Sequence, residues 1–180
     1  EQRVQVRQTE AQLFRDANDA KGALAVLDQA LTELPDSTDL IYDRAMVLEK
    51  LDRIDDAEKA LRRLVELKPD DAQALNALGY TLVDRTTRIQ EGFQLIEKAH
   101  KLAPGDPFIL DSMGWASYRL GRLDEAERFL LRAFATAAEG ARDLAIAADR
   151  RARPPGAAGD DAPPPAVAVS GAGRRVGTDP

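Results

Sequence analysis

The chain repeats one short pattern three times, as Glu33-Leu34-Pro35, Leu67-Lys68-Pro69 and Leu102-Ala103-Pro104. The prolines lie 34 and then 35 residues apart. Each proline follows a segment with helical apolar spacing and precedes acidic or turn residues, which is the pattern expected where a helix ends. A period of this length indicates helical hairpins arranged in tandem, so we expect an all-α fold.

Alignment on the prolines divides the chain into four units, at about residues 4–37, 38–71, 72–106 and 107–140. Small side chains then fall in register at three positions of the unit. The eighth position is Ala11, Ala45, Gly79 and Gly114; the twentieth, with one residue inserted in the third unit, is Ala23, Ala57, Gly92 and Ala126; the twenty-seventh is Ala30, Leu64, Ala99 and Ala133. Antiparallel helices about 8–10 Å apart need small residues where they cross. These positions therefore predict the helix crossings.

The apolar spacing within each unit also indicates paired helices. Leu75, Leu78 and Leu82 recur on one helical face in the third unit, and the second half of each unit carries a similar stripe. These stripes are Leu61, Leu64 and Leu67, then Ile96, Ala99 and Leu102, then Leu130, Ala133 and Phe134. Links such as Asp52-Arg53 and Gly121-Arg122 leave room only for a tight turn. We therefore expect a right-handed α-solenoid of about four hairpins.

Residues 38–140 resemble tetratricopeptide repeats, and the match is close from Asp111-Ser112-Met113-Gly114-Trp115 through Ala126. Three segments also resemble one bacterial group, the outer-membrane-associated lipoproteins that carry many such repeats. They are Asn76-Ala77-Leu78-Gly79-Tyr80, Asp84-Arg85-Thr86 and residues 107–115. Some members of that group are adaptors that present substrates to a periplasmic processing protease. The resemblance implies a periplasmic or outer-membrane location, while a cytoplasmic location stays open.

The C-terminal part departs from the repeat. Residues 141–152 can form one amphipathic helix, with Leu144 and Ala148 facing inward, so we expect a capping helix that closes an array over residues 1–152. From Arg153 the sequence is rich in Pro, Gly and Ala and is predicted to be disordered over 153–180. This tail is either natural or the product of truncation or a frame change. Because the chain begins at Glu1, we expect it to be part of a longer product.

Composition excludes several functions. The 180 residues carry a formal net charge of -6, which argues against binding nucleic acid. There is no cysteine and only one histidine, His100, so Cys-ligated zinc and Ser-His-Asp or Cys-His arrangements cannot be built. We interpret His100 as a solvated or partly packed side chain. No apolar run reaches the ~20 residues of a membrane span. We expect no enzyme activity, catalytic residue, cofactor or metal.

The first helix of each hairpin lines the concave side of such an array, and helical phase identifies its groove-facing positions. These are Asp39, Tyr42, Met46, Glu49 and Lys50; then Gln73, Asn76, Tyr80, Val83 and Asp84; then Phe108, Asp111, Trp115, Tyr118 and Arg119. From this set we predict a partner-binding groove formed by Tyr42, Met46, Asn76, Tyr80, Phe108, Asp111, Trp115, Tyr118 and Arg119. Aromatic residues and Arg are common anchors of binding surfaces. An alternative is that Trp115 and Tyr118 only fill space between units.

The expected function is a non-enzymatic scaffold or adaptor that binds a peptide or protein in this groove, such as a periplasmic protease or its substrates. The alternative is a regulatory or substrate-docking segment of a larger enzyme. Self-association through exposed terminal hairpins is a third prediction. Some tetratricopeptide proteins clamp a partner's C-terminal carboxylate with Lys and Asn. Tyr42 and Met46, or Gln8 and Gln12, stand at those positions here, so we do not expect that mode.

Overall fold

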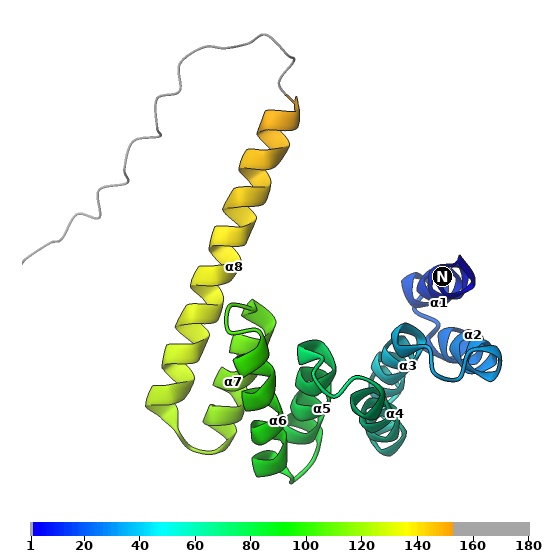
Figure 1. The fold of residues 1–180 in the computed structure, drawn as a ribbon, viewed down its shortest axis with the longest axis horizontal. Helices are drawn as coiled ribbons and strands as arrows, with labels where there is room; N and C mark the ends of the chain where they lie inside the picture. The colour runs from blue at the N-terminus through cyan, green and yellow to red at the C-terminus, as the bar shows by residue number, and fades with distance from the viewer. Residues whose placement is uncertain (1, 153–180) are drawn as a thin grey trace, which may run out of the picture. The chain divides into compact units, whose positions relative to one another are not determined.

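Helices are the only regular elements in the part of the chain that the structure describes. The computed structural model describes the backbone of residues 2–152 and the side chains of residues 2–142. In chain order the helices are α1 (Gln2–Asp16), α2 (Ala20–Glu33), α3 (Thr38–Lys50), α4 (Ile54–Leu67), α5 (Ala72–Arg85), α6 (Ile89–Leu102), α7 (Pro107–Arg119) and α8 (Leu123–Ala152) (Figure 1). The predicted all-α solenoid of about four hairpins is confirmed.

The chain divides into two compact units, Glu1–Asp143 and Leu144–Pro180. In the first unit, each helix from α1 to α6 packs against the next one along the chain. In addition, α1 packs against α3 and α5 packs against α7, so the first helices of these two pairs of hairpins also meet. In the second unit, the described residues 144–152 continue α8.

The turns inside the hairpins explain how two helices reverse direction over so few residues. Asn18, Asp52 and Gly121 have φ of 57°, 59° and 75°, in the left-handed region that Asn, Asp and Gly tolerate best. The third hairpin has an inserted residue and turns differently. There Thr86 Oγ1 donates to the Leu82 carbonyl at 2.6 Å and accepts from the Arg88 N–H at 3.0 Å.

The repeated prolines mark helix ends, as the sequence predicts. α2, α4 and α6 end just before Leu34, Lys68 and Ala103, and each of these residues is followed by a proline. The N–H of each donates 2.9 Å to the carbonyl four residues earlier, and this is the last bond of the helical ladder. Because proline disfavours helical backbone in the residue before it, the chain turns out of the helix at that point.

The small residues of the repeat lie in the core, which confirms their predicted place at the helix crossings. Ala11, Ala23, Ala45, Ala57 and Ala99 are fully buried. The other seven residues at the three positions are buried as well. Larger side chains from α2 to α7 fill the space beside these crossings and form three successive apolar clusters.

The last helix differs from the prediction in two ways. Residues 141–152 continue α8 without a break, so they are not a separate capping helix. Leu130 and Phe134, which were expected to pack, are 42% and 76% exposed. The residues equivalent to Leu130 in the earlier hairpins, Leu27, Leu61 and Ile96, are fully buried because a following hairpin covers them, and no described hairpin follows α8.

Two further expectations concern the chain as a whole. The predicted disordered segment 153–180 lies outside the described residues. Within residues 2–152, none of the helices combines the length and the apolar character that crossing a bilayer requires.

Candidate functional site

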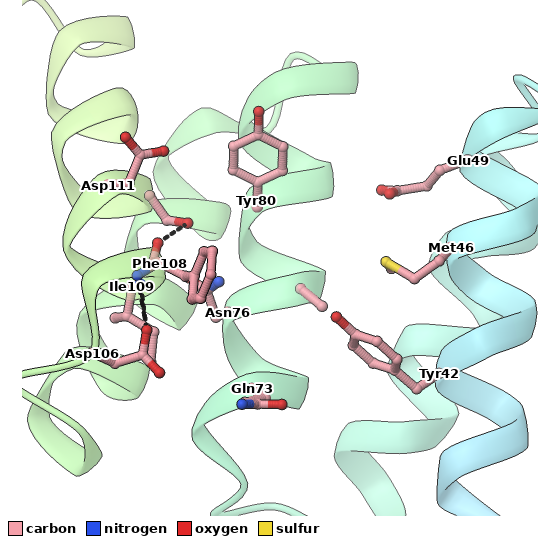
Figure 2. A pocket seen from close by; sticks show the side chains of 12 residues that line it. Tyr42, Met46, Glu49, Gln73, Asn76, Tyr80, Asp106, Phe108, Ile109 and Asp111 are labelled. Carbon is pink, nitrogen blue, oxygen red and sulfur yellow. Dashed lines mark hydrogen bonds between the residues drawn. The ribbon is translucent and has the colours of Figure 1, made fainter. Parts of the chain in front are cut away.

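Three first helices, α3, α5 and α7, line one open cleft with a volume of about 530 Å³. Figure 2 shows their side chains projecting into the same space from separate hairpins. The lining residues are Tyr42, Met46, Glu49, Gln73, Asn76, Ala77, Tyr80, Asp106, Phe108, Ile109, Asp111 and Ser112. A volume of this size is typical of sites that hold a small molecule or part of a peptide.

Helical phase explains why these residues meet. Each first helix buries one face against its neighbours, as Leu75, Leu78 and Leu82 do in α5. The opposite face then presents residues four apart in the sequence, such as Asn76 and Tyr80, because side chains at i and i+4 lie on one side of a helix. Tyr42 and Met46 repeat this spacing in α3.

The start of α7 positions the most exposed aromatic ring of the cleft. Asp106 Oδ1 accepts hydrogen bonds from the backbone N–H of Phe108 at 2.8 Å and of Ile109 at 3.2 Å, and Pro107 occupies the first helical position. This cap fixes where α7 begins. Phe108 follows directly and is 78% exposed, whereas Ile109 turns into the core. An exposed phenyl ring held on a capped helix is a ready contact for an apolar ligand group.

The phenol of Tyr80 lies at the middle of the cleft, between Asp111 on α7 and Glu49 on α3 (Figure 2). Burial raises the pKa of Tyr80, and the charges of Asp84, Asp111 and Glu49 raise it further, while Arg85 lowers it. The pKa of Tyr42 is raised by burial and then by Glu49 and Asp43. Both phenols therefore stay neutral at physiological pH and can donate or accept hydrogen bonds.

One polar group of the cleft has an unmet hydrogen-bonding requirement. Asn76 Oδ1 is buried and accepts no hydrogen bond from residues 2–142. A buried amide oxygen without a donor costs free energy. Ser112, by contrast, is satisfied, because its hydroxyl donates to the Phe108 carbonyl at 2.9 Å.

The structure brings six of the nine predicted site residues together at the cleft. These are Tyr42, Met46, Asn76, Tyr80, Phe108 and Asp111. The other three, Trp115, Tyr118 and Arg119, do not line it. Whether either group contacts a partner stays a prediction.

Trp115, Tyr118 and Arg119 form a separate stack near the end of α7. The rings of Trp115 and Tyr118 are stacked with centroids 5.5 Å apart, and the Arg119 guanidinium lies 5.8 Å from the Trp115 centroid. Arg119 also donates to the Asp84 carbonyl at 3.4 Å, which joins the third and fourth hairpins. Trp115 packs partly into the core beside Met113 and Ala116. This arrangement is closer to the space-filling alternative for Trp115.

Four lining residues were not predicted from the sequence, namely Ala77, Asp106, Ile109 and Ser112. The position of Asp106 could have been predicted, since an Asp directly before a proline such as Pro107 is typical of a helix start. The predicted place of Val83 in the groove is wrong, because this side chain is fully buried and lies against Gly92 at the α5–α6 crossing. Val83 lies close to the hairpin turn, where the start of α6 covers the side of α5 that is open farther from the turn.

Within residues 2–142, no group of three or more His, Cys, Asp or Glu is placed to hold a metal ion. His100 is partly packed, with its ring edge-on to Phe129 at a centroid distance of 5.4 Å. Burial, and then the charge of Arg132, lowers the pKa of His100.

The chain is similar to several known proteins. Residues 14–79 match the model of a family described as tetratricopeptide repeat. A TPR repeat-containing protein of Pseudomonas aeruginosa is 46% identical over 130 residues, which are 72% of this chain and 22% of that protein. The chain therefore spans less than a quarter of the length of this relative.

Two solved structures share the fold. The crystal structure of PilW, described as a widely conserved type IV pilus biogenesis factor, has a TM-score of 0.70 and 25% identity, and covers 76% of this chain and 63% of that one. A thermophilic TPR protein of Thermus thermophilus has a TM-score of 0.66 and 20% identity, with 74% of each chain covered. These structures support the stacked-hairpin fold.

Proposed function

We propose that the chain is a non-enzymatic scaffold or adaptor that holds a peptide segment in the cleft between α3, α5 and α7. The match of residues 14–79 to the tetratricopeptide repeat model supports this class of function. Proteins with this fold mediate contacts between proteins. One observation carries the assignment to this cleft: side chains from three separate hairpins, among them the exposed rings of Phe108 and Tyr80, converge on one space. Such rings are costly to leave in water and are frequent anchors of bound partners.

The cellular setting belongs to the same proposal. The identity with a Pseudomonas aeruginosa relative supports a bacterial source, and the resemblance of residues 76–80 and 107–115 to outer-membrane lipoproteins supports the periplasm. There the partner would be a periplasmic protease or one of its substrates. Cell fractionation followed by immunoblotting tests the location, and recovery only in the cytoplasm would refute it. Self-association stays a prediction, for which the exposed apolar residues of α8 are the relevant surface.

Selection from a random peptide library tests the cleft without knowledge of the partner. The full chain is immobilised, and 12-residue peptides displayed on phage are selected against it. We expect enriched peptides whose binding is lost, by about tenfold or more, in the Tyr80→Ala/Phe108→Ala double variant, because removing two aromatic anchors costs several kcal/mol.

The matched control is Leu131→Ala, which removes an apolar side chain that is 62% exposed on α8, away from the cleft. Circular dichroism confirms that both variants keep their helicity. If the selected peptides bind wild type and the double variant equally, the cleft is not the binding site. If Leu131→Ala weakens binding as much as the double variant does, the surface of α8 is the site instead.

A further inference from the structure

The cleft carries acidic side chains and no basic ones. Its twelve lining residues include Glu49, Asp106 and Asp111, and they include no Lys, Arg or His. Asp106 is occupied as the cap of α7. Glu49 accepts a hydrogen bond from the Thr81 hydroxyl, and Asp111 has no hydrogen bond or ion pair with the described residues. Neither Glu49 nor Asp111 thus forms an ion pair with a described residue, although Arg85 is near enough to lower the pKa of Tyr80.

Many acidic residues elsewhere on the described surface form ion pairs. Glu91 pairs with Arg62 at 2.6 Å, and Asp28 pairs with Arg44 at the same distance. Asp36 and Glu66 both pair with Arg63. Other exposed carboxylates lack such a pair, as Glu49 and Asp111 do, but these two differ from the others in that both face the same recess. Negative charge that collects in a recess with apolar walls is focused there and attracts cations.

The aromatic rings of the cleft favour the same kind of ligand. Tyr80 lies between Asp111 and Glu49 (Figure 2), and a cation beside its ring would be attracted both by the ring face and by the two carboxylates. Burial is the main cause of the raised pKa of Tyr80, and the charges of Asp84, Asp111 and Glu49 add to it, while Arg85 acts in the opposite direction. Phe108, Met46 and Tyr42 offer apolar surface next to this point. A ligand that fits both features carries a positive charge beside an apolar group.

We propose that the cleft recognises a peptide segment in which a Lys or Arg lies next to an apolar side chain. This inference rests on the proposed function and names the class of its ligand. The cationic group lies between Glu49 and Asp111 over Tyr80, and the apolar side chain packs on Phe108 and Met46. The Asn76 amide is within the same cleft and can hydrogen-bond the peptide backbone.

The selected peptides themselves supply the test. We expect Lys and Arg to be enriched beside apolar residues in the cleft-dependent peptides, relative to the starting library. A representative peptide, synthesised with a fluorescent label, should bind less tightly as ionic strength rises, because salt screens the attraction. The Glu49→Gln/Asp111→Asn variant should weaken its binding about five- to twentyfold, since each exposed charge pair contributes about two- to fivefold.

Two features of the design keep the result interpretable. The Glu49→Gln change retains an oxygen that can accept the hydrogen bond from the Thr81 hydroxyl, so the fold should persist. The control variant Asp55→Asn/Glu127→Gln makes the same change in net charge at exposed residues outside the cleft, and should have little effect.

The outcomes separate this inference from the proposed function. Cleft-dependent peptides that are neutral or acidic, or that bind the Glu49→Gln/Asp111→Asn variant as well as wild type, overturn the cationic ligand and leave the peptide-binding cleft intact. Equal weakening by the control variant overturns it too, because the effect would then come from net charge alone. Loss of cleft dependence altogether removes the proposed function and with it this inference.

Discussion

At the scale of the residue, the closest approach between helices occurs where two glycines face each other. A Cβ atom built on Gly92 would lie 2.5 Å from the Gly79 carbonyl oxygen and 2.7 Å from Val83 Cγ2. The oxygen belongs to the backbone of α5, so it cannot move unless the whole helix moves. Gly92 therefore sets the distance between α5 and α6.

Gly92→Ala should destabilise the protein, although alanine is the better helix former. The steric cost of overpacking, about 1–3 kcal/mol, opposes and exceeds the roughly 1 kcal/mol that alanine gains from helix propensity. Gly140→Ala makes the same change in an exposed part of α8, where a Cβ meets nothing within 4 Å, and should stabilise by up to about 1 kcal/mol. Thermal unfolding followed by circular dichroism measures both. Stabilisation by Gly92→Ala would show that the crossing is looser than described.

These crossing residues could be predicted from the sequence, because small side chains recur at a fixed period and have one physical reason to do so. Arg119 shows where such reasoning fails. Its position suggests the groove, but a long flexible side chain selects its partner by local geometry, and it reaches the Asp84 carbonyl. Arg85 and Lys50 reach back in the same way one and two hairpins earlier, to the side chains of Asp52 and Asn18. Periodicity predicts where a Cα lies better than where an Arg side chain ends.

At the scale of the element, the first helices begin with unequal caps. The Asp71 side chain accepts from the N–H of Gln73 at 2.9 Å and of Ala74 at 3.0 Å. Ser37 occupies the same place before α3, and its hydroxyl makes no capping bond. Two N-cap residues of favourable type thus differ in the bonds they form.

Asp71→Ala should therefore lower the free energy of unfolding by about 1 kcal/mol, because two backbone donors lose their acceptor. Ser37→Ala should change it by only a few tenths of a kcal/mol, because the hydroxyl caps nothing. Urea denaturation of both variants checks the pair. Equal losses would mean that Ser37 caps α3 in solution.

At the scale of the whole molecule, the prediction of the cleft succeeded where it depended on helical phase near the middle of a helix. Asn76, Tyr80 and Tyr42 lie there and line the cleft. It could not anticipate that Trp115 packs partly against the core, in a region where α5 and α7 also contact each other. The sequence prediction also placed a helix boundary before residue 141, although α8 is unbroken there. That boundary came only from the repeat length, because residues 141–152 carry no proline or turn signal.

Adjacent hairpins are also joined by charged groups, and Glu58 on α4 is central to one such network. Its carboxylate accepts from Arg62 Nε at 2.8 Å and from Arg88 Nη1, before α6, at 2.7 Å. Arg62 in turn pairs with Glu91 on α6. The Glu58 side chain is only 12% exposed. The hydrogen bonds from Arg88, and then those from Arg62, lower the pKa of Glu58 below its ordinary value of 4.5, although burial acts in the opposite direction.

A pKa that is lowered in the folded state makes stability depend on pH in one direction. Above pH 4.5 the carboxylate is charged in both states, and its bonds to the arginines favour the folded one. As pH falls below 4.5, the unfolded chain takes up the proton first, so this stabilisation declines until the folded-state pKa is passed. Glu58→Gln should therefore cost about 1 kcal/mol at neutral pH and progressively less in acid.

Urea unfolding of wild type and Glu58→Gln at a pH of about 7 and of about 3 measures this difference directly. Glu66→Gln is the control, because Glu66 is 67% exposed and pairs only with Arg63, which keeps Asp36 as a second partner. It should change stability little at either pH. A Glu58→Gln deficit that stays constant or grows in acid would mean that the lost interaction is packing, and that charge does not couple these hairpins.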